Sequence, residues 1–321
     1  FYRTVASGNW NDASIWEVST DPTFTSPVGV PAVAFPTNLN SLGIQVQTGH
    51  TATITANLSI DDAVIDGDVL VNSGITVTIA NGTAANDLII NGSFSNDGIF
   101  TITAPAIVQV IGNYTNTANS GAYTSTAATL FFNAGSFFNH QRNAGVIPTA
   151  AWNSTSTLNI TGVTNTSPTG LAQTLGHVTW NCASQSATVS LTQTLTTVNG
   201  NLSILGTNSQ ILALGSTAAL TLNVLGDLNV SGTSILSLNS GAFVTTLNLS
   251  GNYNQTAGTV TSSATNQIIN FAGTNPARTY TQSGGTLSNN SFTYNVNLAA
   301  FLTLNNSISV ATGKVFTVNG T

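Results

Sequence analysis

The densest cluster of residues with ligand chemistry is acidic and consists of Asp61, Asp62, Asp66 and Asp68. Carboxylate oxygens are the hard ligands that Ca²⁺ takes in proteins. Strand alternation, however, places Asp66 and Asp68 on one outward face, whereas Asp61 and Asp62 straddle a turn. The segment contains neither a twelve-residue calcium loop nor a nonapeptide calcium repeat. We therefore predict a solvated edge here, with calcium as the weaker alternative and no other metal or cofactor.

Catalytic pairs of carboxylates are scarce in most of the chain. Acid–base cleavage of a glycosidic bond needs two carboxylates facing one groove, about 5–9.5 Å apart. After residue 98 the sequence contains a single acidic residue, Asp227. A lyase that uses neutral side chains near His140 or His177 is the remaining enzymatic alternative, although the histidines share no ligand spacing. We predict that the protein is not an enzyme, with a polysaccharide-degrading activity as a less favoured alternative.

Aromatic residues suggest a second kind of site, in which exposed rings would stack on a ligand. The candidates are Phe137, Phe138, Trp152 and Trp180. Large rings more often fill a widened coil or a corner of a repetitive fold, and we favour that interpretation. The lone Cys182 has no sequence partner that would lower its pKa and is expected to be a small buried residue.

A glycine-marked phrase organises the chain and is clearest at residues 220–230, where apolar and polar residues alternate. Alternation predicts strands with one buried face. The period of about 20–26 residues predicts a solenoid that is built coil by coil. Because the glycines share the parity of the buried residues, we expect them at a corner of each coil. These glycines, separated by 25, 20, 88, 26 and 25 residues, are Gly67, Gly92, Gly112, Gly200, Gly226 and Gly251.

The predicted fold is all-β, a right-handed parallel β-helix of about 11–12 coils over residues 58–321. Residues 1–57 contain Trp10, Trp16 and half of the prolines, which predicts an irregular cap over the first edge of the stack. The phrase at 112–118 returns at 250–257, which suggests two tandem blocks. The last residues stop inside a repeat, so we expect a larger polypeptide or a homo-oligomeric partner at that end.

The composition is unusual because only 4% of the residues are charged, against about 25% in an ordinary domain. Thr, Ser and Asn must therefore solvate the surface, which suits a secreted repetitive protein. The net charge of −6 with four basic residues excludes a phosphate-tracking nucleic-acid surface. The sequence shows no apolar run of about 18 residues that would span a membrane.

Two polar patterns accompany the repeat. Asparagines at matching places of successive coils are expected to form side-chain amide ladders along the turns. Thr-x-Thr pairs also recur, as they do on ice-binding solenoids, but at irregular phases. We therefore attribute the Thr pairs to strand propensity and solubility, and we keep ice binding as a less favoured alternative.

The opening Ser7–Asp12 with Trp16, followed by Thr48–Ile54 and by Asn-Gly-rich strands, resembles the large secreted surface proteins of Bacteroidota-type bacteria. Segments 148–162 and 178–182 are also similar to them. The resemblance covers essentially the whole chain and implies an adhesin-like parallel β-helix. It also implies export by the type IX secretion system and attachment at the cell surface. The sorting signal that typically directs this export is not found in this sequence.

The predicted function follows from the repeat and from the resemblance. We expect a structural or adhesive module of a secreted cell-surface protein, or of an extracellular appendage. Such a module would act as a rigid spacer that presents loops to a polysaccharide or protein ligand. The alternative is a carbohydrate-binding module that uses the aromatic residues and the loops near residues 112–155.

Overall fold

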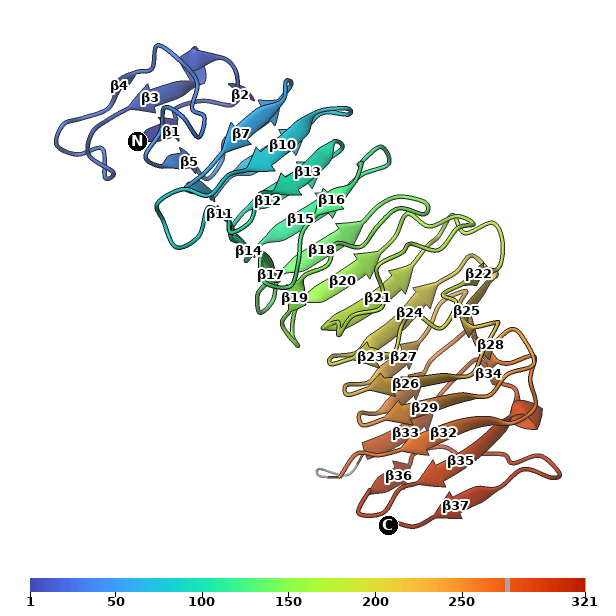
Figure 1. Cartoon of the computed structure of the whole chain (residues 1–321). Helices are drawn as coiled ribbons and strands as arrows, with labels where there is room; N and C mark the ends of the chain where they lie inside the picture. The colour runs from blue at the N-terminus through green and yellow to red at the C-terminus, as the bar shows by residue number, and fades with distance from the viewer. Residues whose placement is uncertain (275–277, 321) are drawn as a thin grey trace. The chain divides into compact units, whose positions relative to one another are not determined.

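The computed structural model describes residues 1–274 and 278–320 and shows an all-β parallel β-solenoid of about ten turns (Figure 1). Within these residues, helical structure is limited to two short 3₁₀ turns, η1 (Ala13–Ile15) and η2 (Asn289–Ser291). The predicted all-β parallel solenoid is therefore confirmed. The chain divides into two compact units, Phe1–Ser156 (unit 1) and Thr157–Thr321 (unit 2).

The described strands of unit 1 stack in sheets that we call 1a, 1b and 1c. In stacking order, sheet 1a contains β4 (Val30–Pro31), β3 (Trp16–Val18), β1 (Tyr2–Thr4), β5 (Ile44–Val46), β8 (Ala63–Ile65), β11 (Leu88–Ile90), β14 (Val108–Val110), β17 (Leu130–Phe132) and β19 (Ala151–Trp152). Sheet 1b contains β2 (Gly8–Asn9), β6 (Thr51–Ile54), β9 (Asp68–Val71), β12 (Ser93–Asn96), β15 (Asn113–Asn116) and β18 (Phe137–His140). Sheet 1c contains β7 (Leu58–Ile60), β10 (Thr76–Ile79), β13 (Ile99–Ile102) and β16 (Tyr123–Thr124).

Unit 2 repeats this arrangement in sheets 2a, 2b and 2c. Sheet 2a contains β23 (Thr197–Val198), β26 (Leu220–Val224), β29 (Thr245–Leu249), β32 (Gln267–Phe271), β35 (Phe292–Val296) and β37 (Phe316–Val318). Sheet 2b contains β20 (Thr157–Ile160), β21 (His177–Asn181), β24 (Leu202–Gly206), β27 (Leu228–Val230), β30 (Tyr253–Gln255), β33 (Arg278–Gln282) and β36 (Leu302–Leu304). Sheet 2c contains β22 (Val189–Ser190), β25 (Ile211–Gly215), β28 (Ile235–Asn239), β31 (Thr259–Thr261) and β34 (Thr286–Leu287).

The N-terminal cap differs from the repeat because its strands pair in a mixed way. β1 pairs antiparallel with β3, and β3 with β4, whereas the other side of β1 pairs parallel with β5. Trp10 and Trp16 are fully buried in the cap, with ring centroids 4.8 Å apart. Parallel pairing already includes β5 and β6, so it begins before residue 58, where we expected the solenoid to start.

The number of turns is slightly lower than the 11–12 expected, because turns in unit 2 are long. Leu202 pairs with Leu228, and Leu228 pairs with Tyr253, so a turn there takes 25–26 residues. The expected number assumes a mean turn length nearer the middle of the range of glycine spacings.

Inward positions form continuous columns of apolar side chains. In sheet 1b, Phe94, Tyr114 and Phe138 are in register, and successive rings stack with centroids 5.4 and 5.7 Å apart. In sheet 2b, Tyr253 and Tyr280 stack at 4.8 Å. Burial of each large apolar side chain contributes about 1.5–3 kcal/mol, so stability is distributed along the columns.

The marker glycines lie at the corner between two sheets, as expected. Gly92, for example, lies between β11 and β12, and its amide donates to the carbonyl of Ile65 one turn earlier, at 2.8 Å. A Cβ on Gly92 would overlap the carbonyl oxygen of Gly67, and one on Gly251 would overlap that of Gly226. Glycine is needed at these positions because backbones of successive turns approach too closely for a side chain.

The long gap between Gly112 and Gly200 contains corners of another kind. The buried Ser136 donates from Oγ to the carbonyl of Asn133 at 2.7 Å, and Ser156 donates to Asn153 at the same distance. A serine hydroxyl thus closes each of these turns internally. The solenoid therefore continues through the gap in the glycine pattern.

Candidate functional site

The most regular polar feature is a ladder of asparagine side chains on the outward face of sheet 2a, which we call the amide ladder. Its members are in register on β26, β29, β32 and β35. Each Nδ2 donates to the Oδ1 of the preceding turn, at 2.8, 2.7 and 2.8 Å. The amide ladder consists of Asn223, Asn248, Asn270 and Asn295.

A second outward ladder follows the neighbouring sheet 2b. Asn254 donates from Nδ2 to Asn229 at 3.0 Å, and Asn229 donates to the hydroxyl of Ser203 at 3.1 Å. Asn305 likewise donates to Thr281 at 2.9 Å. The predicted side-chain ladders thus exist, but they lie on strands rather than along the turns. This placement arises because parallel, in-register strands bring identical outward positions to the spacing of neighbouring strands.

Hydroxyl groups form a shorter column on sheet 1c. Ser59, Thr78, Thr101 and Thr124 are in register on successive strands. The adjacent outward column passes from Thr76 to Ile99, so an apolar residue interrupts it. A flat array with two uninterrupted Thr columns, which the ice-binding alternative requires, is not formed by the described part of this sheet.

A buried polar column in unit 1 was not recognised in the sequence. Asn96, Asn116 and His140 are in register at the ends of β12, β15 and β18, and all three side chains are fully buried. The Nδ2 of Asn116 lies 3.0 Å from the Nδ1 of His140, while the Nε2 of His140 lies 2.7 Å from the carbonyl of Ala144. Asn116 Oδ1 accepts from the amide of Gln141, which orients its Nδ2 toward His140. His140 therefore accepts at Nδ1 and donates at Nε2, as a neutral ring.

Burial lowers the pKa of His140 to about 4, with a smaller contribution from the charge of Arg142. The column could have been anticipated from parity, because Asn96, Asn116 and His140 each lie two residues after an inward aromatic residue. Its physical role is to satisfy polar groups inside a turn rather than to present them to a ligand.

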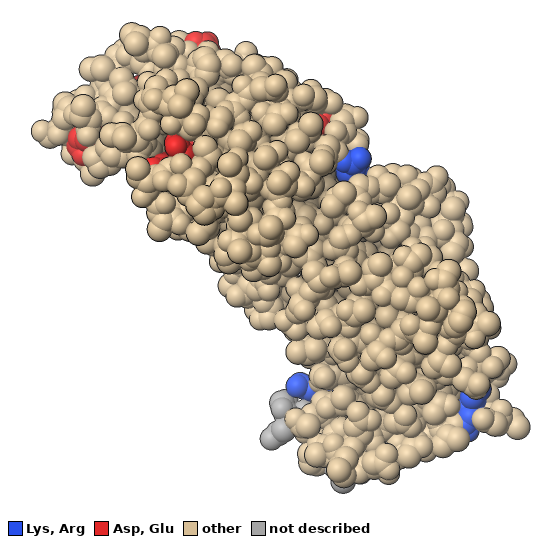
Figure 2. All heavy atoms as spheres, viewed as in Figure 1, with Lys and Arg blue, Asp and Glu red and all other residues tan. Residues whose placement is uncertain are grey.

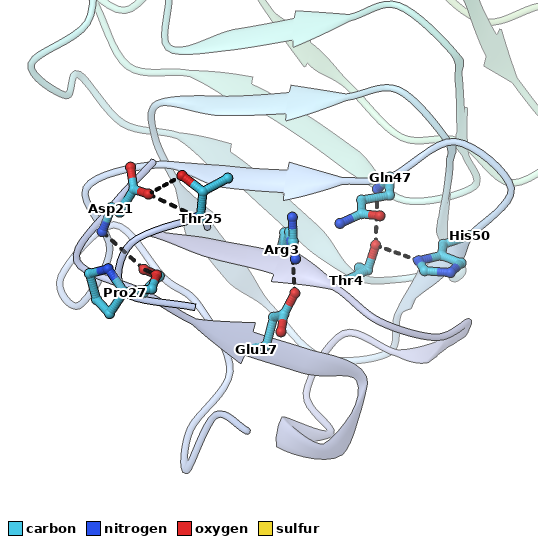
Figure 3. Close-up of polar contacts among 9 residues, drawn as sticks. Arg3, Thr4, Glu17, Asp21, Thr25, Pro27, Gln47 and His50 are labelled. Atoms are coloured by element: carbon cyan, nitrogen blue, oxygen red, sulfur yellow. Dashed lines mark hydrogen bonds and ion pairs between the residues drawn. The ribbon is translucent and has the colours of Figure 1, made fainter. Parts of the chain in front are cut away.

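The cap contains its own polar network (Figure 3). Arg3 forms an ion pair with Glu17 from the adjacent strand and lies over the ring of Phe24, with 4.3 Å from Cζ to the ring centroid. The hydroxyl of the buried Thr4 accepts from the amide of Gln47 at 2.9 Å and lies 2.8 Å from Nδ1 of His50. These contacts attach the first strand to the turn that precedes β6.

The carboxylate of Asp21 organises the loop that follows β3. It accepts hydrogen bonds from the amides of Thr23, Thr25 and Ser26 at 2.9–3.0 Å. The hydroxyl of Thr23, followed by these amides, holds the pKa of Asp21 well below its ordinary value. The loop is thus ordered by a single acidic side chain.

Two shallow hollows lie beside this network in the cap. The larger, of about 410 Å³, is lined mainly by apolar side chains, including Tyr2, Val18, Val28, Val30 and Leu42. The smaller, of about 340 Å³, is lined by residues that include Phe24, Ile44 and Asp62. Among the described residues, these hollows hold no group of three or more His, Cys, Asp or Glu side chains suited to a metal ion.

The structure does not gather the four acidic residues of the calcium hypothesis around one point. Asp62 accepts from the amides of Thr83 and Ala84, whereas Asp66 accepts from the side chains of Gln45 and Asn91. The carboxylates of Asp62 and Asp66 are thus engaged separately, each with its own part of a neighbouring turn. Asp68 is exposed at the start of β9.

Asp61 differs from its neighbours because it is buried. Burial, followed by the negative charges of Asp62 and Asp87, raises the pKa of Asp61 to about 6. Asp87 instead accepts hydrogen bonds from the amides of Gly82 and Ile107, at 2.5 and 2.7 Å. Sequence spacing alone did not show that Asp87 lies close to Asp61, because it belongs to the following turn.

Three of the four candidate stacking residues are buried, which corrects the hypothesis of an exposed aromatic patch. Phe138 and Trp180 are inward residues of β18 and β21, and Trp152 stacks on Phe132 with centroids 4.2 Å apart. The indole of Trp180 donates to the buried side chain of Gln185 at 3.1 Å. Phe137 alone of the four is exposed, at 43%, because it occupies the outward position beside Phe138. The three buried rings fill the core, as the favoured interpretation predicted.

No family model, curated protein or solved structure matches the chain. Among the described residues, no helix is long and apolar enough to cross a membrane. The function must therefore be argued from the geometry of the solenoid itself.

The remaining candidate side chains have structural contacts. Nδ1 of His177 accepts from the amide of Asn201 one turn later, at 2.8 Å. The Sγ of Cys182 is buried and lies 3.4 Å from the carbonyl oxygen of Ile160. Burial raises the pKa of the Cys182 thiol to about 12, so the thiolate is strongly disfavoured. Cys182 is therefore the small buried residue that we predicted.

Proposed function

We propose that the chain is a structural and adhesive module of a secreted bacterial cell-surface protein or extracellular appendage, which acts as a rigid spacer and presents loops for attachment. The observation that supports it most directly is the amide ladder of unit 2. Backbone ladders and side-chain ladders there run from turn to turn through the same strands. Movement of one turn against the next would break both sets of hydrogen bonds together.

The surface chemistry also supports an extracellular role. With 4% charged residues, the protein interacts with water mainly through neutral amides and hydroxyls. Such groups do not change their interactions with ionic strength as exposed ion pairs do. The resemblance of the first residues to type IX secretion substrates supports export to the cell surface, where the ligand would be a polysaccharide or protein.

Rigidity can be tested within unit 2 by spin labelling. Thr179 and Thr281 are outward residues of sheet 2b, and four strand steps separate them through Ser203, Asn229 and Asn254. At about 4.8 Å for each step, Thr179→Cys and Thr281→Cys labels in a Cys182→Ala background should lie about 19 Å apart. We expect one narrow distance distribution in pulsed electron resonance. A broad or multiple distribution would argue against a rigid spacer.

Adhesion and catalysis need a separate experiment. Cells that display the whole chain, and cells that display only the anchor, would be compared on surfaces coated with polysaccharides or extracellular-matrix proteins. We expect the chain to increase retention on one of these surfaces without releasing soluble sugar from it. Equal retention of both cell types would contradict the adhesive role, and sugar release would favour an enzyme.

A further inference from the structure

The last described turn of unit 2 exposes side chains that belong to the core columns. In sheet 2b, the buried Tyr253 and Tyr280 are followed in register by Leu304, which is 47% exposed. In sheet 2a, the buried Val296 is followed by Val318, which is 54% exposed. Inward apolar positions are exposed here because no described strand pairs with the far edges of β36 and β37.

Other apolar residues of the same turn enlarge this surface, which we call the end face. Leu298 is 83% exposed, and Phe301 and Val315 are about half exposed. An apolar surface of this kind, bordered by unpaired strand edges, normally marks a contact with another protein surface.

The cap of unit 1 carries the other concentration of exposed apolar residues, which we call the cap face. It consists of Val28, Val30, Val33, Leu39 and Leu42, with Val33 99% exposed. The larger hollow of the cap opens among them and is lined by Val28, Val30 and Leu42. β4, which contains Val30, has an outer edge to which no described strand is paired.

The charges near the two faces are opposite. Arg278 and Lys314 are the charged residues of the segment from 278 onward, whereas residues 1–42 contain Asp12, Glu17 and Asp21 against Arg3. Figure 2 shows acidic side chains over the N-terminal part of the chain and basic ones at the C-terminal part. Contact between two end faces, or between two cap faces, would place like charges together. Contact between an end face and a cap face would pair opposite charges, which favours that orientation.

We propose that the end face of one copy docks on the cap face of a second copy, so that the protein associates head to tail. The contact uses different surfaces on the two partners, so a dimer retains one free face of each kind. Such heterologous contacts generate open chains of copies when the rotation between partners does not close. This inference does not depend on the adhesive role, because association can be measured in purified protein.

The test uses sedimentation velocity with single variants on each face. Val33→Asp places a carboxylate on the cap face, and Leu298→Asp places one on the end face. Leu225→Asp is the control, because Leu225 is 49% exposed on a turn of unit 2 outside both faces. We expect wild type and the control to form dimers and longer chains as the concentration rises. Each face variant should associate about tenfold more weakly or less, since an unpaired carboxylate would enter an apolar contact.

Mixing the two face variants identifies the orientation. The Val33→Asp protein retains an intact end face and the Leu298→Asp protein an intact cap face, so the mixture should form one-to-one dimers and no longer chains. Circular dichroism and thermal melting of each variant would establish that it is folded. A monomeric wild type at all concentrations, self-association of either face variant, or an equal effect of Leu225→Asp would each overturn the proposal.

Discussion

The side-chain amide of Asn248 donates to Oδ1 of Asn223, 2.8 Å away on the preceding strand, and accepts from Asn270 on the following strand. Asn248 thus joins three turns of unit 2 without contributing to the core. Asparagine is intrinsically unfavourable in strands, so its recurrence at this position needs the ladder as an explanation.

Asn248→Thr separates the ladder from strand propensity. Threonine is the better strand former, and propensity alone predicts a gain in stability. Loss of the amide links to Asn223 and Asn270 predicts instead that the free energy of unfolding falls by about 1 kcal/mol. Urea unfolding followed by circular dichroism measures the sign. A higher unfolding midpoint for Asn248→Thr would show that the ladder contributes nothing.

Gly92→Ala tests the close approach at the corner. Its Cβ would meet the carbonyl oxygen of Gly67, and the overpacking should reduce the stability of unit 1 by about 2–3 kcal/mol. Gly49→Ala is the matched control, since Gly49 has a φ of +84° but no atom within 4 Å of the point where a Cβ would lie. The control should cost only about 1–2 kcal/mol from backbone conformation. Equal thermal shifts for the two variants would contradict the corner contact.

His140 should make unit 1 sensitive to acid. Its pKa is about 4 in the folded protein and about 6.5 when unfolded, so only the unfolded chain binds the proton between these values. Stability is therefore complete above pH 6.5 and should fall by about 3 kcal/mol as the pH drops toward 4. His140→Asn continues the column of Asn96 and Asn116 without a titrating ring. Chemical unfolding at several pH values should show a weaker acid dependence in this variant, and an unchanged dependence would exclude His140 as its cause.

Asp61 should act in the opposite direction. Its pKa is raised to about 6, so the contribution of the protonated carboxyl is complete below the unfolded value of about 3.9 and is lost as the pH rises through 6. Asp61→Asn should therefore raise the melting temperature at pH 7.5 and have little effect at pH 4. The adjacent Asp62→Asn is the control and should lower the melting temperature at pH 7.5, because Asp62 accepts hydrogen bonds from Thr83 and Ala84. Stabilisation by both variants would indicate general charge repulsion instead.

The parts of the fold that the sequence could predict are those with a repeating local cause. Alternation at residues 220–230 defined β26 and β27 and their buried faces, and the marker glycines defined corners. The parallel solenoid followed from their spacing. The antiparallel pairing of β1, β3 and β4 could not be predicted, because it depends on contacts within a segment that occurs once.

The candidate site was less predictable, since its features depend on which residues meet across turns. Asp87 approaches Asp61 from the next turn, and His140 enters a column with Asn116, which lies 24 residues earlier. Phe137 and Phe138 have similar chemistry but opposite exposure, and one step in strand parity decides between them. Without the register of neighbouring turns, these relationships cannot be calculated from local spacing.

The corner glycines also determine how a gene for such a protein can change in length. Gly251 meets the backbone of Gly226 much as Gly226 meets that of Gly200. Loss of the 25 residues from Gly226 to the position before Gly251 would bring Gly251 onto Gly200 and restore the same backbone contact. Unequal recombination between corners would therefore add or remove whole turns while leaving the remaining core in register. Reach can evolve in this way by duplication, without the redesign of any buried residue.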